Sequence, residues 1–250
     1  MPIYPMARFT FIAILCIILQ SCSHFVLQTI TDSDDKIKSD VVYNSTALLA
    51  TSFGIDREEN SEIKAASASG VVVKIDYEKN ISYILTVRHF CIAPAEYDIK
   101  LDDAKFVAYR QIGLANDDYE TYNAFVFYVD EIYDLCIIAA IGTNGFVPIS
   151  VSSKDIQLGE HVTAIGGPNL IYPAKFDGYV IIDYSGKVCN KCIVIGVPSS
   201  EGSSGSPVYN DNHELVGIIV AVNRDNNNIT IMTSLSAIKS VLKKSLVLNQ

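Results

Sequence analysis

The sequence predicts an all-β domain, a sandwich or a barrel, that ends in a single α-helix. Two observations support this fold class. From about residue 41, short runs rich in Val, Ile, Tyr and Thr recur between Gly, Asn and Asp, and no helical pattern lies between them. Hydrophobic residues make up 49% of the 250 residues and charged residues only 19%, so the chain can bury a full core and is neither disordered nor a coiled coil.

Residues 1–21 are predicted to be a signal peptide that lies outside the fold. The apolar stretch at residues 9–19 follows Arg8, and it is shorter than the roughly 20 residues that a helix needs to cross a bilayer. A basic residue before a short apolar core is the pattern of a secretory signal. We therefore expect an exported protein.

Cys22 lies where a bacterial lipoprotein is lipidated. Leu19 stands three positions before it and the small Ser21 directly before it, which resembles a lipobox. The resemblance implies that Cys22 becomes the lipidated first residue of a protein anchored in the cell envelope. Cleavage near Ser21 or Ser23, giving a secreted or periplasmic protein, and an uncleaved anchor are the alternatives. Residues 22–40 are polar and charged, and we expect them to form a tether.

The domain itself is expected at residues 41–250. Strands are predicted at residues 70–75, 81–87, 104–111, 121–129, 161–165, 178–184, 192–197 and 215–222. Near the end of the chain, Ser234 is a suitable N-cap, and apolar residues follow it at helical spacing: Leu235, Ile238, Val241, Leu242 and Leu246. One amphipathic helix is therefore expected to pack on the β-structure.

The charge balance disfavours one large class of partners. The chain carries 19 Lys and Arg against 28 Asp and Glu, a formal net charge of −9. A surface that binds nucleic acid needs clustered basic residues, whereas the only adjacent basic pair is Lys243 and Lys244. We expect no nucleic-acid partner, and contact with a membrane only through an N-terminal lipid.

Residues 201–206 have the composition of a turn that exposes a nucleophile. A serine hydroxyl is a weak nucleophile, so an acyl-transfer site presents it on a tight turn beside backbone N–H groups that can bind an oxyanion. Gly202 and Gly205, on either side of Ser204, permit such a turn because glycine tolerates left-handed backbone angles. Taken alone, the segment could also be an ordinary Gly/Ser loop.

Two further residues could complete such a site. His89 follows the predicted strand at residues 81–87, where a general base could lie over the turn. Asp134 leads directly into a buried apolar strand predicted at residues 135–140 and could hold an imidazole in one tautomer. A surface or core histidine and a turn aspartate are the alternatives. The remaining histidines, none of which closes a Leu-Thr strand, are His24, His161 and His213.

The three candidates follow one another as His89, Asp134 and Ser204, at intervals of 45 and 70 residues. This order is that of chymotrypsin-type barrels and differs from the orders in subtilisins and α/β-hydrolases. The sequence resembles bacterial serine proteases of the chymotrypsin fold, close to the high-temperature-requirement proteases and the glutamyl endopeptidases. The resemblance runs from about residue 65 to 245, with motifs at residues 69–73, 85–89, 134–135, 158–168, 202–210 and 214–218.

The resemblance implies two six-stranded antiparallel β-barrels with the active site in the cleft between them. His89 and Asp134 would come from the first barrel and Ser204 from the second. Ser204 would attack a peptide carbonyl, His89 would transfer the proton, and Asp134 would orient His89. The N–H groups of Gly202 and Ser204 would form the oxyanion hole. Such an enzyme acts on proteins or peptides, and we expect neither a cofactor nor a metal.

Some positions depart from the family pattern. Ser203 replaces the aspartate that pairs with a freed N-terminus in digestive proteases, so activation by that ion pair is not expected. Arg88 replaces a small residue. Glutamyl endopeptidases carry a histidine where this chain has Ile219, so a glutamate preference is not expected. We expect an apolar substrate pocket instead, lined by Ile219, Val220, Ala221 and Val222.

Four cysteines lie in the exported part of the chain. Cys91 and Cys136 each lie two residues after a candidate catalytic residue, so the expected site would bring them close together. They could form a disulfide or be buried as small apolar residues. Cys189 and Cys192 flank a hairpin turn and could be bridged or free.

Two other classes of function are alternatives to a serine endopeptidase. A catalytically silent barrel of the same fold could be a binding or scaffold module, but it would be expected to have lost a catalytic residue, and all three are present. A cysteine-based redox or metal protein is disfavoured, because no helix follows the Cys189–Cys192 motif and the other two cysteines are widely spaced.

Overall fold

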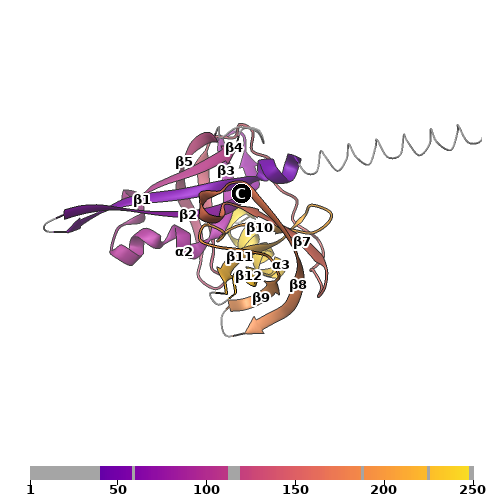
Figure 1. Cartoon of the computed structure of the whole chain (residues 1–250). Coiled ribbons are helices and arrows are strands. Elements are labelled where there is room, and N and C mark those ends of the chain that lie inside the picture. Colours follow the sequence, from indigo (N-terminus) through magenta and orange to yellow (C-terminus); the bar gives the residue numbers. More distant parts are fainter. Residues whose placement is uncertain (1–39, 58–59, 112–118, 187–188, 224–225, 248–250) are drawn as a thin grey trace, which may run out of the picture. The chain divides into compact units, whose positions relative to one another are not determined.

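The computed structural model describes residues 40–57, 60–111, 119–186, 189–223 and 226–247. The strands below all belong to one compact unit, Val41–Gln250. They form two closed barrels in which every pair of neighbouring strands is antiparallel (Figure 1). The predicted all-β class and the two barrels implied by the family resemblance are thereby confirmed.

The first barrel closes in the order β1-β2-β3-β6-β5-β4. Its strands are β1 (Thr46–Arg57), β2 (Asn60–Asp76), β3 (Ile81–Val87), β4 (Lys105–Gln111), β5 (Tyr119–Asp130) and β6 (Leu135–Ile141). Strands β3 and β6 pair without a register shift, and Val87 at the end of β3 lies opposite Leu135 at the start of β6. The residues that follow β3 therefore lie beside the residues that precede β6.

The second barrel closes in the order β10-β11-β12-β9-β8-β7. Its strands are β7 (His161–Gly166), β8 (Ala174–Gly186), β9 (Cys189–Ile195), β10 (Pro207–Tyr209), β11 (Leu215–Val222) and β12 (Thr230–Thr233). Strand β10 follows directly on the turn that contains Ser204. It is held between β7 and β11, so the end of that turn is anchored in the barrel.

Helical segments are short. Helix α2 (Arg88–Cys91) follows β3, and 3₁₀ turns lie at Ala93–Tyr97, Leu101–Asp103 and Pro168–Leu170. The predicted C-terminal helix is α3 (Leu235–Leu242), and the hydroxyl of Ser234 caps it by accepting a hydrogen bond from the N–H of Ala237. Among the helices of the described residues, none is long and apolar enough to cross a membrane.

Three strands had no counterpart in the sequence prediction. Strand β1 mixes Ala, Ser, Thr and Gly with its larger apolar residues, which dilutes the β-branched signal. Strands β10 and β12 have three and four residues, too few to show an alternating pattern. All three are specified by pairing with neighbouring strands in the closed barrels.

Two buried tyrosines bind the first strand of the first barrel. The hydroxyl of Tyr209, at the end of β10, lies 3.1 Å from Oγ1 of Thr46. The hydroxyl of Tyr172 donates to the carbonyl oxygen of Thr46 at 2.7 Å. Burial raises the pKa of Tyr209 to about 12, so it keeps its proton at neutral pH. These contacts fasten the second barrel and its β7–β8 connection to β1.

Candidate active site

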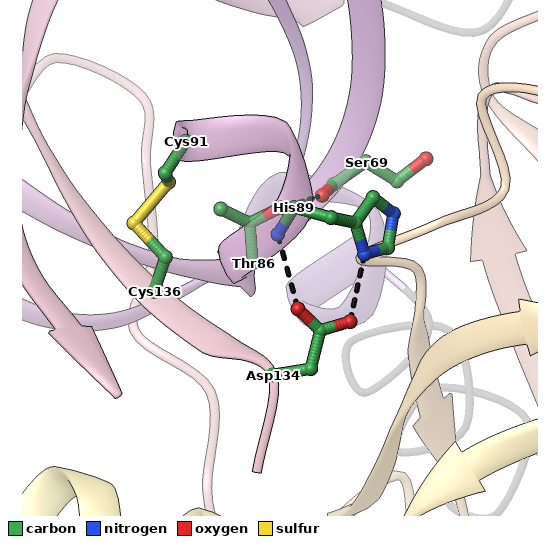
Figure 2. The surroundings of a disulfide bond; sticks show 6 residues. All are labelled: Ser69, Thr86, His89, Cys91, Asp134 and Cys136. Carbon is green, nitrogen blue, oxygen red and sulfur yellow. Dashed lines mark hydrogen bonds and ion pairs between the residues drawn. A yellow bond between two sulfur atoms is a disulfide. The ribbon is translucent and has the colours of Figure 1, made fainter. Parts of the chain in front are cut away.

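His89 and Asp134 form a close pair at one end of the first barrel. The Oδ2 atom of Asp134 lies 2.7 Å from Nδ1 of His89, and Oδ1 accepts a hydrogen bond of 3.0 Å from the backbone N–H of His89 (Figure 2). The carbonyl oxygen of Asp134 also accepts from the N–H of Arg88 at 2.9 Å. One aspartate therefore fixes both the backbone and the ring of the histidine.

The backbone at Asp134 is left-handed, with φ of +53°. Few residues other than glycine adopt this region readily, and aspartate and asparagine are among them. His89 lies in the first turn of α2, two residues after Val87, the last residue of β3. Its side chain is 43% exposed and that of Asp134 is 36% exposed, so solvent or a substrate can reach the pair.

A disulfide joins the elements that carry this pair. Cys91 in α2 is bonded to Cys136 in β6, and both cysteines are fully buried (Figure 2). Of the two possibilities that the sequence left open, the bridge is the one found. Cys192 is also disulfide-bonded, whereas the side chain of Cys189 lies outside the described part of the structure.

Replacing both Cys91 and Cys136 by alanine is expected to lower the free energy of unfolding by about 3–4 kcal/mol, because the bridge closes a loop with a sequence separation of 45 residues in the unfolded chain. Urea unfolding under oxidising conditions measures the change. The same comparison with reductant is the control, since the difference should then largely vanish. Equal unfolding midpoints under oxidising conditions would contradict the stabilising role.

The turn that carries Ser204 depends on two glycines in the left-handed region. Gly202 has φ of +86° and Gly205 of +85°. A Cβ atom would lie 2.4 Å from the carbonyl oxygen of Gly167 at the first position, and 1.9 Å from that of Ser69 at the second. No other residue fits at either position without a shift of the backbone.

The Ser204 turn is bonded directly to the first barrel. The N–H of Ser69 in β2 donates to the carbonyl oxygen of Ser204 at 2.7 Å. The carbonyl oxygen of Ser69 in turn accepts from Oγ1 of Thr86 at 2.7 Å, and Thr86 lies three residues before His89 (Figure 2). The backbone of Ser204 is therefore two hydrogen bonds away from the strand that leads to the histidine.

The peptide unit between Glu201 and Gly202 has a fixed orientation. The carbonyl oxygen of Glu201 accepts a hydrogen bond of 2.7 Å from the N–H of Asn169. Because a trans peptide is planar, the N–H of Gly202 points the opposite way. Among the described residues, neither this N–H nor that of Ser204 has a hydrogen-bond acceptor. Two backbone donors of the Ser204 turn are thus available.

Other positions singled out in the sequence have identifiable contacts. The hydroxyl of Ser203, the residue expected to stand where digestive proteases carry an aspartate, accepts from the N–H of Ser200 at 3.0 Å and closes the turn. The guanidinium of Arg88 lies 3.9 Å from the carboxylate of Glu131, an exposed and weak ion pair.

The residues expected to line a substrate pocket are divided between two environments. Ile219 and Val220 are buried in the apolar cores, with 2% and 7% exposure. Ala221 and Val222 are half-buried, so they are the more accessible members of the set. Gly205 is tied to this strand, because its N–H donates to the carbonyl oxygen of Ile219 at 2.8 Å.

His161 forms a second contact between a histidine and a carboxylate. Its Nδ1 atom lies 2.7 Å from Oδ1 of Asp211 on the surface of the second barrel. It borders an open hollow of about 830 Å³, and most of the residues around this hollow are polar or charged. The lining of that hollow includes no residue of the Ser204 turn or of α2. His161 is therefore not part of the site built around His89.

The sequence pattern predicted no role for the side chains of Ser69 and Thr86 or for the backbone of Asn169. Ser69 and Thr86 lie within motifs shared with the family, but the order of residues along the chain does not indicate which contacts between the barrels they make. Asn169 has φ of +50° in the turn after Gly167 and Pro168, a conformation for which asparagine is well suited.

Two closed six-stranded antiparallel barrels are the chymotrypsin fold, the fold of the trypsin-like serine peptidases. Residues 68–218 match the family model of the trypsin-like peptidase domain. That segment is more than half of the chain, and the chain belongs to this family. A comparison with curated proteins found no match.

The fold also resembles solved structures. One is the HtrA-type protease AlgW, in a variant form with a decapeptide, which has 16% sequence identity and a TM-score of 0.67. The alignment covers 85% of this chain and 67% of that chain. At this identity the likeness bears on the fold, and it agrees with the resemblance to high-temperature-requirement proteases.

Proposed function

We propose that the protein is a serine endopeptidase that hydrolyses peptide bonds with Ser204, His89 and Asp134. The observation that carries the proposal is the double hydrogen bond from His89 to Asp134, at 2.7 and 3.0 Å. The glycine-flanked Ser204 turn, which is hydrogen-bonded to Ser69 in β2 of the first barrel, supports it. That the HtrA-type neighbour was solved with a decapeptide supports a peptide substrate.

The carboxylate of Asp134 sets the protonation of the histidine ring. An ionised carboxylate only accepts hydrogen bonds, so Nδ1 of His89 carries the proton and Nε2 is left as the base. Nε2 takes the proton of the Ser204 hydroxyl as Oγ attacks the carbonyl carbon of the substrate. The oxygen of the tetrahedral intermediate becomes negative and accepts hydrogen bonds from the N–H groups of Gly202 and Ser204.

Breakdown of this intermediate cleaves the C–N bond. The leaving amine takes the proton from Nε2 of His89, and the acyl group stays as an ester on Ser204. A water molecule then attacks the ester carbon while His89 accepts its proton. Expulsion of Ser204 Oγ, which regains that proton, releases the carboxylic acid product and restores the enzyme.

Covalent labelling with a fluorophosphonate is the experiment that tests this function, because the probe reacts with an activated serine. Wild-type protein is expected to label at one site. Protein that never labels would favour the alternative, a silent barrel used for binding or as a scaffold.

The substrate pocket is expected to prefer an apolar side chain before the cleaved bond. Ala221 and Val222 offer no charge or hydrogen-bonding side chain, and the same holds for the buried Ile219 and Val220. Cleavage of a library of peptides that vary at this position measures the preference. Preferred cleavage after a charged residue would refute an apolar pocket.

Export and lipidation at Cys22 are part of the proposal and rest on the pattern of residues 1–22 alone. Mass spectrometry of the mature N-terminus tests them. A lipidated Cys22 is expected, and an unmodified N-terminus beyond that residue would remove the lipid anchor.

A further inference from the structure

Ser69 is a fully buried polar residue in β2 that the reaction scheme does not use. Its side-chain oxygen donates to the carbonyl oxygen of Gly202 at 2.9 Å and accepts from the N–H of Gly167 at 2.9 Å. Its N–H donates to the carbonyl oxygen of Ser204, and its own carbonyl oxygen accepts from Thr86. Every polar group of this one residue is therefore bonded, and three of the four bonds reach the second barrel.

These bonds converge on the expected oxyanion hole. Gly202 and Ser204 supply the two N–H groups that would bind the oxyanion, and Ser69 holds the carbonyl oxygens of the same two residues. A planar peptide cannot turn unless its carbonyl leaves its partner. The N–H and the carbonyl of one residue lie in successive peptide planes. By holding the carbonyl of Gly202, the hydroxyl of Ser69 therefore restrains rotation of the backbone at Gly202. The N–H of Ser69 restrains the backbone at Ser204 in the same way.

The third partner, Gly167, extends this restraint. It begins the turn in which Asn169 holds the carbonyl of Glu201, the peptide that carries the N–H of Gly202. Ser69 thus restrains the Glu201–Gly202 peptide through two sets of contacts. One is its direct bond to Gly202, and the other is its bond to Gly167, whose turn carries Asn169. A side chain that bonds both Gly202 and Gly167 must donate one hydrogen bond and accept another. A hydroxyl group can do both, and a methyl group can do neither.

We propose that Ser69 is a positioning residue that keeps the two oxyanion-binding N–H groups in place from across the barrel interface. The inference rests on the proposed peptidase function. Ser69 touches no reacting atom and acts through Gly202, Ser204 and Gly167. Its removal should therefore impair stabilisation of the tetrahedral intermediate, and leave the His89–Asp134 pair as it is.

The test is Ser69→Ala in the full-length protein, compared with the wild type. We expect kcat to fall by about 10–100-fold, less than the roughly 100–1,000-fold typical of losing an oxyanion donor outright, with KM changed by about twofold or less. Affinity for a peptide boronate, which forms a tetrahedral adduct on the serine, should fall in the same proportion. The pH dependence of kcat/KM should not move, because the variant leaves the contacts of His89 intact.

Ser82→Ala is the matched control. Ser82 is a fully buried serine at the other end of β3, and its hydroxyl donates to a backbone carbonyl, that of Gly142, at 2.8 Å. It should lose comparable stability but keep kcat within about twofold. If Ser69→Ala does not fold, Ser69→Cys, which keeps a weak donor of similar size, should have a kcat below that of the wild type.

The outcomes separate this inference from the proposed function. Wild-type protein that neither cleaves peptides nor labels would end the peptidase function itself. An active wild type with unchanged kcat and boronate affinity in the Ser69 variants would overturn only the positioning role. Equal losses in Ser69→Ala and Ser82→Ala, or a shifted pH profile in Ser69→Ala, would also overturn it.

Discussion

Ser204→Ala is expected to abolish fluorophosphonate labelling and to lower kcat for peptide hydrolysis by at least about 10⁴-fold. The substitution removes the atom that forms the acyl-enzyme ester in the proposed reaction. It leaves the turn intact, because the backbone bonds of Ser204 and the two left-handed glycines do not involve the hydroxyl. Mass spectrometry of the labelled protein and steady-state kinetics measure the two effects.

Ser82→Ala serves as the control here as well, since it removes a buried hydroxyl at the far end of β3. It should label like the wild type. Labelling of Ser204→Ala at the wild-type rate would identify a different nucleophile and would refute the assignment of Ser204. Peptide cleavage retained at the wild-type rate by the Ser204→Ala variant would also refute it.

Asp134→Asn should lower kcat by about 10⁴-fold, the size of the effect of the corresponding change in chymotrypsin-type proteases. The carboxylate accepts hydrogen bonds from both the N–H and Nδ1 of His89. An asparagine has one acceptor oxygen, so its amide group faces either the backbone N–H or the ring. If it faces the ring, the proton moves to Nε2 and the base is lost.

The matched control for this variant is Asp130→Asn, at the end of the neighbouring strand β5. The carboxylate of Asp130 accepts from the N–H groups of Ile132 and Tyr133 and from Lys244. It has no contact with His89 among the described residues, so kcat should stay within about twofold. Equal kcat values for Asp134→Asn and the wild type, measured with peptide substrate, would show that this aspartate does not orient the base.

Sequence patterns predicted the parts of the molecule that depend on local chemistry. Runs of β-branched residues marked most strands, and Ser234 marked the start of α3. The order of His89, Asp134 and Ser204 along the chain indicated the family by itself, because this order differs between the chymotrypsin-type barrels and the other folds that carry a triad. The contact between His89 and Asp134 follows from the pairing of β3 with β6.

Contacts between distant segments could not be predicted in the same way. Ser69 bonds Gly167 and Gly202, which lie 98 and 133 residues further along the chain. The packing of the two barrels decides which serine hydroxyl lies within hydrogen-bonding distance of these two glycines. The periodicity of the sequence does not determine that packing. The choice between a bridged and a buried Cys91 was open for the same reason, since composition allowed both.

The left-handed backbone at Asp134 has an evolutionary consequence. At φ of +53° most substitutions would strain the chain, whereas asparagine and glycine would be accepted with little disturbance. The replacements that spare folding are thus ones that remove the carboxylate. Loss of activity by mutation here would leave an intact barrel, and natural selection could then retain such a descendant for adhesion or assembly.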